Sequence, residues 1–142
     1  MTESSPKILI KRAYEPPARD DGIRILVDRL WPRGLRKDDA HFDQWRKDLS
    51  PSTTLRQFYG HRPERFPEFI RRYRTELRRK DAVAAIEEIV GLTRRHPVTL
   101  LTASRDLTHS EAAVLASHVR AIVTHRAHSH RSIERSRSKG RP

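Results

Sequence analysis

The chain has 142 residues, with 30 Lys and Arg against 18 Asp and Glu, which gives a formal net charge of +12. Its length fits one compact domain, but its 35% of apolar residues is low and its 34% of charged residues is high, so part of the chain should lie outside a small core. No apolar run approaches the roughly 18–20 residues of a membrane span, and the first residues lack the apolar segment of a signal peptide. Because there is no cysteine, disulfides, thiol nucleophiles and thiolate zinc sites are excluded. We therefore expect a cytoplasmic bacterial protein with no membrane partner.

Three short apolar runs predict β-strands. Residues 7–11 lie between prolines, residues 23–30 follow the turn signal Asp20-Asp21-Gly22, and residues 97–102 open with Pro97. The second and third runs are apolar almost throughout, which is typical of central parallel strands covered on both faces by helices.

The helical period dominates between the second and third runs. We expect helices from Ser50-Pro51 to Gly60, from Pro63 to about residue 80, and over residues 81–95. A last helix is expected from Thr108 to about Arg120, opened by a Thr108–Glu111 capping box. The order strand, strand, helices, strand, helix predicts an α/β fold: a small, mainly parallel sheet flanked by helices in a single layered domain.

The composition divides the chain into three segments. Residues 1–6 are expected to be a flexible N-terminus and residues 7–120 the domain. Residues 121–142 form a basic tail with six basic residues and one acid. Because the tail has few apolar side chains, we expect disorder from about residue 124. Such a tail is either a solvated extension or a grip for nucleic-acid phosphates.

Two loops occupy the position where open α/β sheets collect ligands, beyond the carboxyl ends of the strands. They are residues 28–34 and residues 103–109. If the strands run parallel, both loops emerge at one edge and face one pocket. The central hypothesis is that this pocket is positively charged.

The first loop combines an aromatic side chain with two guanidinium groups. Arg29 and Arg33 carry donor forks suited to phosphate or carboxylate, and Trp31 is costly to expose. Either Trp31 is the wall of an anion pocket, or it plugs the core while the arginines pair with acids. We assign ligand binding to a set that includes residues of the neighbouring strands: Arg12, Tyr14, Arg24, Arg29, Trp31 and Arg33.

Three polar side chains are candidate catalytic residues: Asp28, Asp106 and His109. Asp28 ends a buried strand, and Asp106 and His109 offer a carboxylate and an imidazole at the start of a helix. Their structural alternatives are a salt bridge for Asp28, helix-dipole stabilisation for Asp106 and simple exposure for His109. We assign no metal, since Asp-x-x-His-x-Glu is a weak pattern and the histidines of the tail lack a scaffold. No nucleotide-binding glycine motif is present, and the cofactor stays unknown.

Several segments together carry a family resemblance: residues 11–14, 21–34, 45–52, 55–61 and 98–101, with Phe69, Tyr73, Glu76, Asp106 and His109. On these segments the chain resembles the YeaO-like family, bacterial proteins that carry domain of unknown function 488. The resemblance covers roughly residues 7–120, and it implies an α/β fold but brings no established reaction. Two departures are Ser110, where family members tend to have asparagine, and the lack of the cysteine found in longer relatives.

Three readings of the function follow. The first is a small anionic ligand, phosphorylated or nucleotide-like, bound at the loops after the second and third predicted strands. The alternative is a nucleic-acid-binding accessory protein that uses the tail and the arginine-rich face of the helix that begins at Pro63. The third is an interaction protein without a small-molecule site. The sequence leaves open whether the protein is an enzyme and which oligomeric state it adopts.

Overall fold

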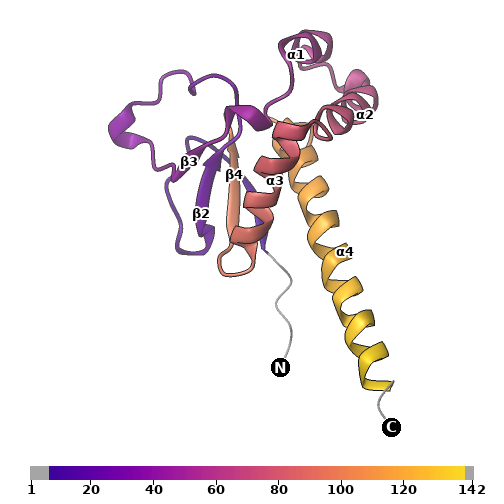
Figure 1. Cartoon of the computed structure of the whole chain (residues 1–142). Coiled ribbons are helices and arrows are strands. Elements are labelled where there is room, and N and C mark those ends of the chain that lie inside the picture. The colour runs from indigo at the N-terminus through magenta and orange to yellow at the C-terminus, as the bar shows by residue number, and fades with distance from the viewer. Residues whose placement is uncertain (1–6, 140–142) are drawn as a thin grey trace.

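A four-stranded parallel sheet forms the centre of the computed structural model, which describes residues 7–139, with side chains described for residues 7–127. The predicted flexible segment 1–6 lies outside the described residues. The strand order is β1-β4-β2-β3, and every pairing is parallel. This confirms the predicted α/β class and parallel sheet (Figure 1). The strands are β1 (Ile8–Arg12), β2 (Ile23–Leu26), β3 (Gln44–Trp45) and β4 (Val98–Thr102).

Strand β4 enters the sheet between two strands that precede it in the chain. Leu100 lies opposite Ile10 of β1 and Ile25 of β2, and all five residues of β4 are buried. Gly22 allows β2 to start against the beginning of β4, because a Cβ on this glycine would lie 2.0 Å from the carbonyl oxygen of Pro97. Its φ of +63° also favours glycine. The position of β4 brings the loops after β2 and β4 side by side.

Strand β3 was not predicted. It consists of two residues, Gln44 and Trp45, which pair with Ile25 and Leu26 at the edge of the sheet. A two-residue strand has no alternation that sequence patterning can detect.

The helices follow the predicted order, with corrected ends. They are α1 (Thr53–Tyr59), α2 (Phe66–Glu76), α3 (Lys80–Thr93) and α4 (Glu111–Lys139). The predicted start of the last helix at Thr108 and its Thr108–Glu111 capping box are wrong, since Ser110 takes the capping role. The Ser110 hydroxyl accepts a hydrogen bond from the backbone N–H of Ala113 at 3.2 Å.

The two faces of the sheet are covered differently. Ile25 and Leu100 belong to the main core cluster, which includes residues of all four helices, for example Leu115 of α4. Leu26 and Leu101 belong to a smaller cluster on which Phe42 and Trp45 pack. The second face is therefore covered by aromatic side chains from β3 and the segment before it. The expectation of helices on both faces is wrong for this face.

Helix α4 continues past its predicted end near Arg120 and reaches Lys139. In Figure 1 its C-terminal part extends well away from the sheet. Ile122 and Val123 still pack on the core, and Arg126 forms a two-pronged ion pair with Glu87 of α3, so the helix is anchored beyond residue 120. Disorder from about residue 124 stays a prediction, and residues 140–142 lie outside the described residues. None of the helices within residues 7–139 has the length and apolar character needed to cross a membrane.

Candidate functional site

The loops after β2 and β4 line one cavity of about 720 Å³ at the carboxyl edge of the sheet. This volume falls within the range of about 300–1,000 Å³ that small-molecule sites occupy. The start of α4 and the end of α1 complete the wall. Seven of the nine residues selected from the sequence line the cavity: Tyr14, Asp28, Arg29, Trp31, Arg33, Asp106 and His109.

Asp28 joins the two loops. One of its carboxylate oxygens accepts a hydrogen bond from the Thr102 hydroxyl and the other from the backbone N–H of Ala103, both at 2.8 Å. Its own carbonyl oxygen accepts a hydrogen bond from the indole N–H of Trp45 at 2.7 Å. The sheet edge thus fixes the position and orientation of this carboxylate.

A second carboxyl group, that of Glu111, forms a hydrogen bond with Asp28. Glu111 begins α4 and is half-buried. Burial, together with the hydrogen bond and the negative charge of Asp28, raises the pKa of Glu111 well above its usual range, although Arg56 and Arg29 act in the opposite direction. Glu111 therefore keeps its proton to a higher pH than a free glutamic acid does. Glu111 was predicted as a helix-cap residue and not as a site residue, although its place directly after the second loop was an available signal.

Asp106 and His109 form a pair in the second loop. The Nδ1 atom of His109 lies 2.7 Å from a carboxylate oxygen of Asp106, and the hydrogen bond from His109 holds the pKa of Asp106 below its usual value. The His109 ring also makes an edge contact with Phe66 at 5.1 Å, and its carbonyl oxygen accepts a hydrogen bond from the Tyr59 hydroxyl at 2.5 Å. These contacts hold His109 in place. The other ring nitrogen, Nε2, has no hydrogen-bond partner among residues 7–127.

Four arginines line the cavity: Arg29, Arg33, Arg56 and Arg105. None of them forms an ion pair with an acid in the part of the chain whose side chains are described. Arg29 has one long hydrogen bond, 3.5 Å, to the carbonyl oxygen of Pro51. Arg56 and Arg105 were not predicted as site residues, because a lone arginine on a short helix or in a polar loop carries no distinguishing pattern.

Trp31 both packs in an aromatic cluster and lines the cavity. Its indole N–H donates to the carbonyl oxygen of Leu35 at 2.7 Å, and its ring packs on Phe42 and Trp45 at centroid distances of 5.4 and 5.6 Å. The same residue lines the cavity. The aromatic cluster therefore holds Trp31 rigidly at the cavity wall.

Tyr14 attaches the first loop to the end of β1. Its hydroxyl donates to the carbonyl oxygen of Arg33 at 2.8 Å, and Gly34 follows with a φ of +80°. Arg12 stands behind Tyr14, with its guanidinium carbon 4.9 Å from the ring centroid and one N–H bonded to the carbonyl oxygen of Ala103. Arg12 supports the wall but does not line the cavity.

The assignment of Arg24 to the site needs correction. Arg24 lies at the start of β2, whereas the cavity lies beyond the end of that strand. Arg24 is only 4% exposed. Its guanidinium donates hydrogen bonds to the Asp21 carboxylate and to the carbonyl oxygens of His41 and Glu15. Its hydrogen-bonding capacity is used within the fold.

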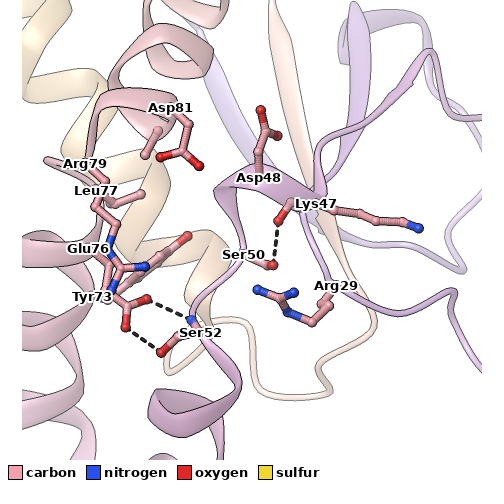
Figure 2. Close-up of a pocket in the computed structure, with 11 residues that line it drawn as sticks. Arg29, Lys47, Asp48, Ser50, Ser52, Tyr73, Glu76, Leu77, Arg79 and Asp81 are labelled. Carbon is pink, nitrogen blue, oxygen red and sulfur yellow. Dashed lines mark hydrogen bonds between the residues drawn. The ribbon is translucent and has the colours of Figure 1, made fainter.

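Arg29 lines a second, smaller cavity of about 350 Å³ as well (Figure 2). The two cavities therefore adjoin at its side chain. No residue of this second cavity other than Arg29 was selected from the sequence, because its lining comes from segments spread over residues 29–82.

Comparison with known proteins places these features in a family. A family model described as "Inactive DUF488-N3 subclade" matches residues 7–137. The uncharacterized protein Rv3073c of Mycobacterium tuberculosis is 49% identical over 110 residues, which cover 78% of this chain and 91% of that protein. The uncharacterized protein YeaO of Escherichia coli is 36% identical over 115 residues, which cover 81% of this chain and 98% of YeaO. No solved structure gives a significant match.

Proposed function

This chain belongs to the YeaO-like DUF488 family, within its inactive N3 subclade, and we propose that it binds a small anionic ligand between the loops after β2 and β4. The ligand is phosphorylated or nucleotide-like. The observation that carries the proposal is the group of four arginines around the larger cavity that have no carboxylate partner among the described side chains.

The acids that line the same cavity do not outweigh this positive charge, because Asp28 and Asp106 are two carboxylates against four arginines. Asp28 is held by two hydrogen bonds from the sheet edge, and Asp106 is held by its hydrogen bond with His109. Glu111 is the acid whose raised pKa favours the neutral form. The guanidinium groups of the wall are thus free for an incoming anion, for which their donor geometry is suited.

The apolar part of the wall supports a ligand larger than a bare anion. Trp31 and Tyr14 come from the loop side, and Tyr59 and Phe69 come from α1 and α2. Aromatic side chains next to a cluster of arginines suit a phosphorylated compound that also carries a ring.

The description of the subclade as inactive supports binding in place of catalysis. In this proposal Asp28, Asp106 and His109 are polar groups that orient the ligand. No reaction is assigned to them.

Thermal unfolding in the presence of a panel of nucleotides and sugar phosphates tests the proposal, with Arg33→Ala as the site variant. Arg36→Ala is the matched control, since it removes the same charge from an exposed residue just beyond this loop that does not line the cavity. A ligand at a hundredfold excess over its Kd stabilises the native state by about 2.7 kcal/mol. We expect the wild type and Arg36→Ala to be stabilised, and Arg33→Ala to bind at least about tenfold more weakly, since it loses a charge-assisted hydrogen bond. An equal response of all three proteins, or none, would contradict the proposal.

The nucleic-acid alternative has weaker support on helix α2. Glu68 forms ion pairs with both Arg71 and Arg72, and Arg65 donates a hydrogen bond to the carbonyl oxygen of Phe58. Three of the six arginines on this face (Arg65, Arg71, Arg72, Arg74, Arg78 and Arg79) therefore already have partners within the protein. Binding to RNA or DNA that weakens steeply with salt, and that is lost when residues 121–142 are removed, would favour the alternative.

A further inference from the structure

The smaller cavity lies between the segment after β3, the end of α2 and the first turn of α3. It measures about 350 Å³, within the range of small-molecule sites. In Figure 2 the guanidinium of Arg29 points from one side toward the segment that carries Ser50 and Ser52. Arg29 also lines the larger cavity, so a ligand bound in either cavity can contact this residue.

The lining of the smaller cavity is mainly polar and differs from the aromatic wall of the larger one. It contains two hydroxyl groups, three carboxylates and three cationic groups, and its apolar contribution is limited to Leu77, Ala82 and the side chain of Tyr73. The polar residues are Ser50, Ser52, Asp48, Glu76, Asp81, Arg29, Lys47 and Arg79.

Several of these groups are used within the fold. Glu76 accepts hydrogen bonds from the backbone N–H and the hydroxyl of Ser52, at 2.7 and 2.5 Å (Figure 2). The ammonium group of Lys47 lies 4.1 Å from the ring centroid of Trp45, and Asp48 lies 3.8 Å from Arg46. These residues form the frame of the cavity.

Asp81 and Arg79 remain without a side-chain hydrogen bond or ion pair among residues 7–127, although both line the same small cavity. The cavity therefore offers a free acceptor at Asp81 and free donors at Arg79 and Arg29. An ammonium group only donates hydrogen bonds and a phosphate mainly accepts them, whereas a hydroxyl group does both. A ligand with neighbouring hydroxyl groups is therefore best suited to donate to Asp81 and to accept from Arg79 and Arg29.

We propose, on the basis of the anion-binding function above, that the smaller cavity holds the hydroxyl-bearing sugar of a ligand whose phosphate is bound at Arg29. The ligand class is then a sugar phosphate. Asp81 accepts hydrogen bonds from the sugar hydroxyls and gives the protein its preference for a sugar phosphate over inorganic phosphate.

Calorimetric titration of the full chain with ribose 5-phosphate and with inorganic phosphate tests this inference. The variant is Asp81→Ala, and the matched control is Asp39→Ala, which removes the same charge from an exposed residue that lines neither cavity. We expect the wild type and Asp39→Ala to bind ribose 5-phosphate about tenfold more tightly than inorganic phosphate, and Asp81→Ala to lose this preference.

The direction of the change separates a sugar contact from a general charge effect. Removing a negative charge near a phosphate strengthens anion binding, so Asp81→Ala should bind inorganic phosphate at least as well as the wild type does. A preference for ribose 5-phosphate that survives in Asp81→Ala overturns the inference. Equal affinity of the wild type for the two compounds also overturns it, yet leaves the proposed anion site standing. If the wild type binds neither compound, both the proposed anion site and this inference are contradicted.

Discussion

The two ends of strand β2 use arginine in opposite ways. At its start, Arg24 is buried and donates to the buried Asp21 carboxylate, which also binds Lys11. Beyond its end, Arg29 and Arg33 are exposed and have no carboxylate partner among the described side chains.

The difference follows from burial. A charge removed from water needs a partner, whereas a charge that water still reaches does not. Charge at the start of β2 therefore serves the fold, and charge beyond its end stays available to a ligand. Burial alone would raise the pKa of Asp21. The hydrogen bonds from Lys11, the Ala18 N–H and Arg24 nevertheless hold this pKa below its usual value.

The largest expected effect comes from removing the buried guanidinium. Arg24→Ala leaves Asp21 buried with Lys11 as its remaining cation, and breaking a buried pair of this kind costs about 3 kcal/mol. Urea unfolding of the variant and the wild type measures the difference. A loss below about 1 kcal/mol would mean that the start of β2 does not depend on this pair.

The next effect concerns the acid pair in the larger cavity. Because Glu111 has a raised pKa in the folded state, its contribution to stability is present at low pH and is lost as the pH rises through that raised value. Glu111→Gln keeps the shape and hydrogen-bonding capacity of the neutral acid but does not ionise.

We therefore expect Glu111→Gln to match the wild type at low pH and to become the more stable protein as the pH rises. Urea unfolding from about pH 4 to about pH 9 measures the difference. A difference between the two proteins that does not change with pH would contradict the raised pKa. Because the Asp28 carboxylate stays in place in the variant, the comparison isolates the proton on Glu111.

The smallest effect on stability is expected at the free arginines. Arg29→Ala and Arg33→Ala should each change the free energy of unfolding by about 0.5 kcal/mol or less, because neither guanidinium forms an ion pair in the described structure. Urea unfolding in ligand-free buffer measures this. A loss as large as that of Arg24→Ala would show that these arginines serve the fold and would remove the contrast between the two ends of β2.

The convergence of the two loops was predictable from the sequence because it depends on strand direction alone. Three apolar runs with helices between them predict parallel strands, and parallel strands place residues 28 and 103 at the same edge. The residues of those loops were found in the same way, since each directly follows a strand.

The rest of the site depends on packing between distant segments. Arg56 reaches the cavity from α1 and Glu111 from the start of α4, and neither position has a local pattern that indicates its neighbours. Arg24 was misassigned although its place at the start of the predicted strand 23–30 already put it at the end opposite the loops. The Ser110 cap replaced the predicted Thr108 cap, since threonine and serine are both capping residues and these two lie only two positions apart.

The central claim is that the arginines beyond β2 bind an anion and the arginine at its start does not. NMR observation of the arginine side-chain N–H signals during titration with ribose 5-phosphate and inorganic phosphate tests it most directly. We predict that the signals of Arg29 and Arg33 shift with saturation while that of Arg24 stays in place. Shifts confined to arginines of α2, or no saturable shift at Arg29 and Arg33, would contradict the account.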